Sequence, residues 1–222
     1  MSRAAAIIDL VPRDAAGARE IGFFVPERYN ASAILFDNLE AARDRCAVTG
    51  PAGSRSYAEL AADADRFGAG LLSLGLRRGE RVLLFLDDTP AYPAALFGAI
   101  RAGLVPLLIN TLTPPELLQF YLSDSQATVA VCDAGFADRF NADACRDTRL
   151  ETLVIVNGDA APPGPAKTLS AAAWLVRPPA PFAPADTRRD DMAFWMYSSG
   201  STGRPKGIVH LQHDMLYTHL SY

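Results

Sequence analysis

The sequence has few cysteines and no long apolar run. Cys46, Cys132 and Cys145 are odd in number and far apart, and no pair has CxxC spacing. This pattern argues against a disulfide framework and a zinc site, and it favours a reducing compartment. No run approaches the ~18 apolar residues that a membrane span needs, and the run within residues 1–10, interrupted by Asp9, is too weak for a signal peptide. We therefore expect a cytoplasmic protein with no membrane partner.

Lysine is also scarce, and arginine supplies nearly all the positive charge. The formal net charge is -4 and the pI is about 5.4, and Lys167 and Lys206 are the only lysines among 21 cationic side chains. Without a basic stripe, a nucleic-acid surface is not expected. Half of the 222 residues are apolar, which supplies ample material for a core. Neither composition nor charge indicates the oligomeric state.

Amphipathic helices and short apolar strands alternate from Ser56 onward. Ser56 and Glu59 have capping-box spacing, and apolar residues then recur at helical intervals until Gly75. Further strands are expected at residues 81–87, 104–110, 127–132, 152–156 and 192–197, and further helices at about 90–102, after a Thr113 cap, and between 132 and 152. Strands separated by helices predict right-handed crossovers. The predicted fold class is therefore α/β, with a parallel-rich sheet covered by helices on both faces.

The pattern changes at both ends of this alternating region. Residues 1–55 are expected to form an N-terminal extension that leads into the domain, and residues 56–222 an incomplete α/β domain. Prolines are frequent between residues 157 and 190, where only a short helical patch is expected. We interpret this stretch as a long surface connection, because Trp174 and Phe182 still need cover.

A loop rich in hydroxyls and glycines follows the strand that ends at Tyr197. Residues 198–207 read Ser-Ser-Gly-Ser-Thr-Gly-Arg-Pro-Lys-Gly. The glycines allow sharp turns and close approach of a ligand, the hydroxyls and free amides can donate to phosphate oxygens, and Lys206 adds a point charge. Pro205 removes one amide, so residues 198–204 must build most of the cradle. The loop is predicted to hold phosphates.

Other phosphate-binding patterns fit this loop poorly. In a Walker A loop the lysine follows glycine and precedes serine or threonine, whereas here Pro205 precedes Lys206 and Gly207 follows it. The glycines also lack the GxGxxG spacing of a dinucleotide site. A simple polar turn between two strands would explain the glycines and serines but not the combined order of hydroxyls, glycines, proline and lysine.

With these residues in place, the loop resembles a known signature. SSGSTGRPKG is similar to the signature loop of the adenylate-forming enzymes: acyl-CoA synthetases, peptide-synthetase adenylation domains and firefly luciferase. Residues 56–60, 79–82 and 99–110 match the order of that family's N-terminal domain, so the resemblance covers the chain from about residue 25 onward. Within the family, residues 26–30, 194–198 and 207–210 resemble benzoate- and hydroxybenzoate-CoA ligases.

The resemblance implies a two-step reaction. ATP and an aromatic carboxylate form an acyl-adenylate with release of pyrophosphate, and the thiol of CoA then displaces AMP; Mg²⁺ is implied as a cofactor with ligands mostly outside this chain. The implied roles are phosphate contact for the hydroxyls, backbone access for the glycines and charge for the lysine, at Ser198, Ser199, Ser201, Thr202, Gly200, Gly203 and Lys206. These are binding roles, and we expect no catalytic and no metal-ligating residue in the chain.

Several family segments have no counterpart here. The resemblance places the segment that meets adenine and magnesium, the ribose-binding aspartate, the hinge and the catalytic lysine beyond residue 222. A helix expected to enter at His213 and Asp214 also stops without a glycine cap. We therefore expect an incomplete, inactive piece of an aryl-CoA ligase. The alternatives are another acyl-CoA synthetase, an amino-acid adenylating enzyme, or a non-catalytic nucleotide-binding module.

A few other side chains could reach a ligand. His210 is a candidate contact to the carboxylate substrate, whereas His213 fits a helix entrance better. Phe194, Trp195 and Tyr197 alternate in a strand expected to be central, where core packing is favoured over adenine stacking. Cys132 is interpreted as a small buried apolar residue.

Overall fold

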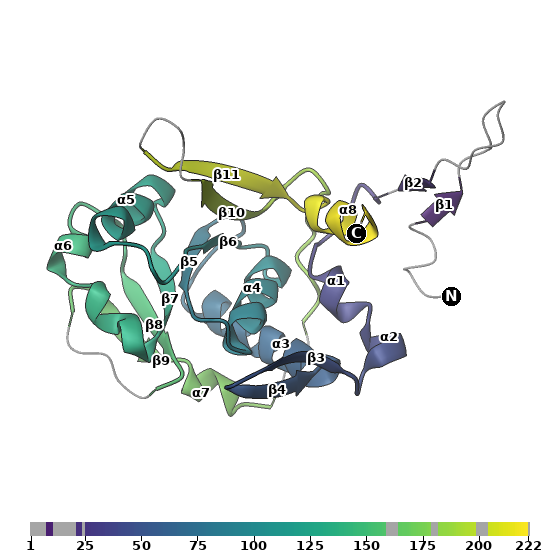
Figure 1. Ribbon diagram of the computed structural model, residues 1–222, viewed down its shortest axis with the longest axis horizontal. Helices are drawn as coiled ribbons and strands as arrows, with labels where there is room; N and C mark the ends of the chain where they lie inside the picture. Colours follow the sequence, from purple (N-terminus) through teal and green to yellow (C-terminus); the bar gives the residue numbers. More distant parts are fainter. Residues whose placement is uncertain are drawn as a thin grey trace.

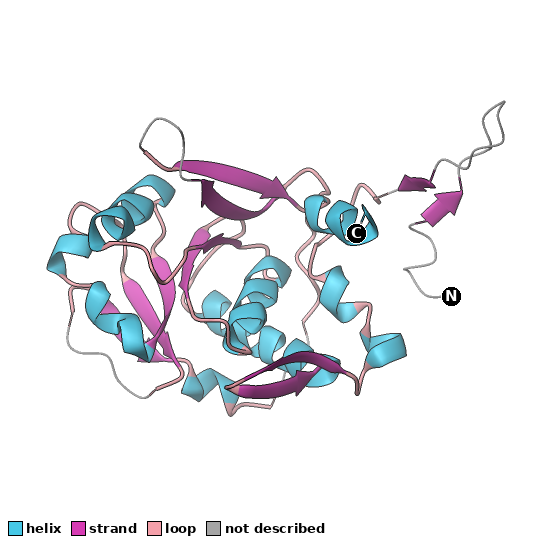
Figure 2. Ribbon diagram, in the orientation of Figure 1, coloured by secondary structure: helices cyan, strands magenta, loops and turns pink. Residues whose placement is uncertain are grey.

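The computed structural model describes residues 8–10, 21–23, 25–158, 164–178, 182–198 and 204–221. Its main feature is a seven-stranded sheet with helices on either side of the strands (Figures 1 and 2). Two small antiparallel pairs accompany it, β1 (Ile8–Leu10) with β2 (Ile21–Phe23), and β3 (Cys46–Gly50) with β4 (Gly53–Ser56). None of the helices within these ranges is long and apolar enough to cross a membrane.

The large sheet has the order β11-β10-β6-β5-β7-β8-β9. Its strands are β5 (Arg81–Phe85), β6 (Val105–Leu108), β7 (Val129–Asp133), β8 (Thr152–Val156), β9 (Lys167–Ser170), β10 (Met192–Ser198) and β11 (Lys206–Leu211). All neighbours pair in parallel except β11, which is antiparallel to β10. The predicted α/β fold with a parallel-rich sheet is confirmed.

Helices connect these strands and cover the sheet. They are α1 (Ala33–Phe36), α2 (Leu39–Ala42), α3 (Tyr57–Ser73), α4 (Ala91–Arg101), α5 (Pro115–Ser125), the 3-10 helix η2 (Ala134–Arg139), α6 (Ala142–Cys145), α7 (Ala172–Leu175) and α8 (Asp214–Ser221). The predicted capping box is confirmed, because Ser56 Oγ accepts from Glu59 N at 3.2 Å and Glu59 Oε2 accepts from Ser56 N at 2.8 Å.

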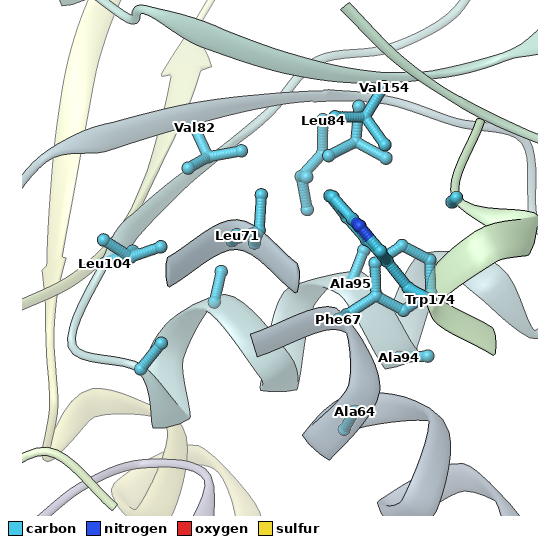
Figure 3. Close-up of a cluster of buried hydrophobic side chains, with 14 of the residues drawn as sticks. Ala64, Phe67, Leu71, Val82, Leu84, Ala94, Ala95, Leu104, Val154 and Trp174 are labelled. Carbon is cyan, nitrogen blue, oxygen red and sulfur yellow. The ribbon is translucent and has the colours of Figure 1, made fainter. Parts of the chain in front are cut away.

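The two larger buried clusters form layers, one on each face of the sheet, and a third, smaller cluster includes Val25 and Leu216. Val82 and Leu84 of β5 point into the layer of α3 and α4, while Leu83 and Phe85 point into the layer of α5 and η2. Successive residues of a strand face opposite sides, so a continuous apolar run serves both layers. Figure 3 shows the α3 and α4 layer, in which the Trp174 ring meets Phe67 edge-on with centroids 6.3 Å apart.

Four expectations about elements need correction. Thr113 does not cap α5, because Pro114 is the N-cap residue and makes no side-chain cap bond, which leaves Thr113 one position too early. The helix expected between β7 and β8 is instead η2 followed by the single turn α6. The proline-rich stretch is not only a surface connection, because Lys167–Ser170 forms the edge strand β9. Such a short polar edge strand lacks the apolar pattern that predicts a strand.

The fourth correction concerns β10, which is not central. It lies between β6 and β11, one position from the edge of the sheet, because β11 is the single strand beyond it on that side. Strand β11 itself was not expected. Cys132, in contrast, is fully buried as predicted, and burial raises the pKa of its thiol. A buried thiol of this kind acts as a small apolar side chain.

Candidate functional site

The β10–β11 hairpin frames the loop that the sequence predicts to bind phosphates. Ser198 is the last residue of β10 and Lys206 the first of β11, and the two are register partners across the hairpin. The loop therefore leaves and re-enters the sheet at one point. The other predicted phosphate-binding residues lie outside the described part of the chain, namely Ser199, Gly200, Ser201, Thr202 and Gly203.

The hairpin places this loop at the carboxyl edge of the parallel strands. β10 runs parallel to β6, with Met196 paired to Leu108, so the end of β10 at Ser198 lies on the same edge as the end of β6. Open α/β sheets bind their ligands at this edge. The position of Ser198 and Lys206 thus agrees with a ligand-binding role.

A cleft of about 280 Å³ lies beside the hairpin at the same edge. Residues from the ends of β5 and β6, the start of α4, and β10 line it: Leu86, Asp87, Asp88, Tyr92, Leu108, Ile109, Asn110, Thr111 and Met196. The sequence analysis did not select these polar residues. Asp87 and Asn110 each lie two residues beyond the end of a buried apolar strand, and no local pattern in the sequence groups them.

A polar network orders the loops around this cleft. Asp133 Oδ2 accepts from the backbone N of Asp87 at 2.7 Å, and Asp87 Oδ1 accepts from Thr111 Oγ1 at 3.1 Å. Asn157 Nδ2 donates to Asp133 Oδ1 and to Thr89 Oγ1. Asp133 is buried and its oxygens are satisfied by these donors, so it holds the loops together instead of offering itself to a ligand.

Tyr197 anchors the end of the hairpin that carries the loop. Its hydroxyl donates to Asp124 Oδ2 of α5 at 2.8 Å, and its ring lies 4.3 Å from that of Tyr121 between centroids. Burial, followed by the bond to Asp124 and the charge of that carboxylate, raises the pKa of Tyr197. The phenol is therefore held as a hydrogen-bond donor. Trp195 packs on the same face, in agreement with the predicted packing role of these two aromatic residues.

His210 lies apart from the loop. It pairs with Phe194, four residues before Ser198 along β10, and its ring stacks on that of Phe194 at 4.5 Å with an interplanar angle of 10°. His210 Nδ1 lies 3.2 Å from Asp214 Oδ2. Together with residues of α1 and α8, this pair lines a separate cavity of about 320 Å³. The structure does not bring His210 to the phosphate loop.

His213 is held by acceptors on both sides of its ring. Its Nδ1 lies 2.9 Å from the backbone oxygen of Arg189, and its Nε2 lies 3.1 Å from Asp214 Oδ1. It precedes α8 directly, so its predicted place at a helix entrance is confirmed. Across the described ranges, no group of three or more His, Cys, Asp or Glu side chains could hold a metal ion.

Curated proteins resemble this chain over most of its length. A benzoate–CoA ligase of Thauera aromatica is 40% identical over 197 residues, which are 87% of this chain and 36% of the relative. A 4-hydroxybenzoate–CoA/benzoate–CoA ligase of Rhodopseudomonas palustris is 38% identical over 185 residues, 82% of this chain and 33% of the relative. The chain thus spans about a third of the length of these relatives.

A solved structure and a family model agree with these relatives. The crystal structure of the anthranilate CoA ligase AuaEII in complex with anthranoyl-AMP matches with a TM-score of 0.81 at 30% identity, covering 88% of this chain and 37% of that one. The model of the AMP-binding enzyme family matches residues 35–222. The resemblance carried by residues 198–207 is thereby confirmed, and the chain belongs to the AMP-binding enzyme family.

Proposed function

We propose that this chain is the phosphate-binding part of an AMP-forming ligase that activates an aromatic carboxylate, benzoate or a hydroxybenzoate. The enzyme would join the acid to AMP from ATP and then transfer the acyl group to CoA. The observation that carries this proposal is the pairing of Ser198 with Lys206 at the carboxyl edge of the sheet, at the two ends of the signature loop. The names of the relatives support the aromatic acid as substrate.

The residue roles follow from the charge of ATP. The phosphates must be held and their charge offset while the carboxylate oxygen attacks the α-phosphorus, so preorganised amides, hydroxyls and a cation are suited to the loop. Lys206 would supply the cation and Ser198 a hydroxyl, with further contacts from Ser199, Gly200, Ser201, Thr202 and Gly203. His210 is proposed to contact the acid, because it lines the cavity beside α8. Mg²⁺ would be held mostly by residues outside this chain.

A panel of acids tests the substrate class. The protein as its gene encodes it is incubated with ATP, Mg²⁺, CoA and one acid at a time, and pyrophosphate release and thioester formation are measured. We expect benzoate, hydroxybenzoates or aminobenzoates to exceed aliphatic acids and amino acids in kcat/KM. A preference for a medium-chain aliphatic acid would replace the aromatic assignment with another acyl-CoA synthetase, and a preference for an amino acid would replace it with an adenylating enzyme of that class.

The 222 residues alone are proposed to lack turnover. We propose that they comprise a leading extension, residues 1–55, and an incomplete domain, residues 56–222. They span about a third of the length of the relatives. We expect the purified 222-residue chain to release no pyrophosphate with any acid of the panel, while the protein encoded by the whole gene does. Turnover by the 222-residue chain would contradict this proposal. If both proteins bind ATP and neither turns over, the non-catalytic nucleotide-binding module is the better description.

A further inference from the structure

The base of the phosphate loop carries a pair that has no role in the chemistry described above. Tyr197 and Gly207 are register partners directly outside the Ser198–Lys206 pair. A side-chain Cβ placed on Gly207 would lie 3.5 Å from Tyr197 Cε1 and 3.9 Å from Asp124 Oδ2. The Tyr197 ring therefore lies against the backbone of the opposite strand, and the phenol and the carboxylate meet over it.

Helix α5 is what holds this ring in place. Asp124 lies in the last turn of α5 and accepts the Tyr197 hydroxyl at 2.8 Å, while Tyr121, one turn earlier, packs on the ring. The bond joins residues 73 positions apart in the sequence. It ties the end of the hairpin to an element that itself covers the sheet. Asp124 is exposed, so its carboxylate could be solvated by water and does not need the Tyr197 hydroxyl as a partner.

The outward-facing residues of the hairpin add little support, whereas Trp195 packs beside Tyr197 on the inner face. Met196, Ile208 and Val209 are 43%, 43% and 42% exposed, although all three are apolar. β11 is also the edge strand, with β10 as its only strand partner in the sheet. An edge strand without packed side chains is loosely constrained. The Tyr197–Asp124 contact with α5 therefore helps to fix the positions of Ser198 and Lys206.

We propose that Tyr197 and Asp124 are positioning residues for the phosphate loop, which they set by clasping its base onto α5. The proposal rests on the proposed function of the loop. Neither residue binds phosphate itself, since Asp124 is an anion and the Tyr197 hydroxyl already donates to it. They act by fixing the geometry of Ser198 and Lys206, so that these two residues are preorganised before ATP binds.

Three variants separate this role from simple stabilisation. Tyr197→Phe keeps the ring and loses the hydroxyl, Asp124→Ala loses the acceptor, and Asp124→Asn keeps an acceptor oxygen in place. A hydrogen bond to a charged group that positions a binding loop corresponds to a change of about tenfold in affinity. In the protein as its gene encodes it, we expect the first two variants to raise KM for ATP by about tenfold, with KM for the acid and for CoA changed less than twofold. Asp124→Asn is expected to stay near wild type.

A matched control is available at a distant hydrogen bond. Ser56→Ala removes the α3 cap and lowers stability without reaching the loop, so its KM for ATP is expected to remain unchanged. Thermal unfolding of every variant accompanies the kinetics. If the ATP effect of Tyr197→Phe is matched by Ser56→Ala at equal loss of stability, or if Asp124→Ala leaves KM for ATP unchanged, the positioning role is overturned. Asp124 is exposed, so its variants remain informative even if Tyr197→Phe fails to fold.

A binding measurement separates failure of this proposal from failure of the proposed function. Inorganic tripolyphosphate is titrated into wild type, Tyr197→Phe and Asp124→Asn by calorimetry, where no turnover is needed. About tenfold weaker binding by Tyr197→Phe alone supports the clasp even in a protein without ligase activity. Active wild type with equal binding by all three proteins overturns the clasp and leaves the function standing. If wild type neither binds tripolyphosphate nor turns over ATP, both are overturned.

Discussion

Arg101 of α4 and Asp65 of α3 form an ion pair inside the protein, with Arg101 Nε 2.8 Å from Asp65 Oδ1 and both side chains nearly buried. Arg101 also donates to the backbone oxygen of Phe182 at 2.7 Å, and its guanidinium lies 3.7 Å from the ring centroid of Phe36. Burial raises the pKa of Asp65 although Arg101 acts to lower it. The cost of removing the carboxylate from water therefore exceeds the attraction of its partner.

Breaking this pair is expected to cost more than losing an exposed one. Asp65→Asn leaves a buried guanidinium without its counter-charge, and we expect the free energy of unfolding to fall by about 3 kcal/mol, measured by urea denaturation of the 222-residue chain. Asp143→Asn is the control, because the Arg146–Asp143 pair is exposed and should contribute under about 0.5 kcal/mol. Equal losses for the two variants would show that burial does not strengthen the Arg101–Asp65 pair.

The crossing of α3 and α4 depends on a glycine. A Cβ on Gly98 would lie 2.4 Å from the backbone oxygen of Ala64 and 2.9 Å from the backbone N of Gly68, atoms that cannot move without displacing α3. We expect Gly98→Ala to destabilise the chain by about 2 kcal/mol or more in chemical denaturation. Gly135→Ala is the matched control, since nothing lies within 4 Å of its added Cβ. Its effect should be within about 1 kcal/mol of zero.

The capping box makes a small part of the stability depend on pH. Bonds from the backbone and then the side chain of Ser56 lower the pKa of Glu59 below its ordinary value of 4.5. A carboxylate with a lowered folded-state pKa stabilises the fold above that ordinary value, and the contribution is lost as the pH falls through the folded pKa. From pH 6 to pH 3, the unfolding temperature of wild type should therefore fall further than that of Glu59→Gln. Parallel losses would rule out this contribution.

The two lysines allow a clean test of the phosphate-binding role. Lys206 begins β11 beside the loop, whereas Lys167 begins the edge strand β9 at the other side of the sheet. Lys206→Ala should raise KM for ATP by about tenfold or more in the protein as its gene encodes it, because a charge-assisted contact to phosphate is lost. Lys167→Ala removes the same charge and should change KM for ATP by less than about twofold. If both substitutions act alike, the effect is one of net charge and not of the loop.

Expectations drawn from short stretches of sequence agree best with the structure. Ser56 and Glu59 form the expected capping box, and the apolar residues of β5 are buried on alternate faces. Strand β9 was missed because it is four residues long and polar. The predicted cap Thr113 lies one residue before the true N-cap residue, because two consecutive prolines make the start of α5 ambiguous in the sequence. In each case the signal was weaker than the tertiary contacts that decide the outcome.

Some residues of the candidate site could be selected from the sequence, whereas others are brought together only by the fold. The residues at the two ends of the loop, Ser198 and Lys206, could be selected from the order of hydroxyls, glycines, proline and lysine. The cleft residues could not be weighed, because Asp87, Asn110 and Met196 come together only when β5, β6 and β10 lie in one sheet. His210 was selected as a contact to the carboxylate substrate; its ring stacks on Phe194 in a separate cavity, and its contact to the acid stays a prediction.

The sequence by itself determined most of the helices and strands, the α/β class and the signature loop of the family, because caps, breaks and alternation act between residues a few positions apart. Only the tertiary structure decided that β10 lies beside β6 near the edge of the sheet, and that Tyr197 reaches Asp124. Those pairings join residues far apart in the chain, and the packing of both faces of the sheet selects them. No local preference of either partner encodes the contact that fixes the base of the loop.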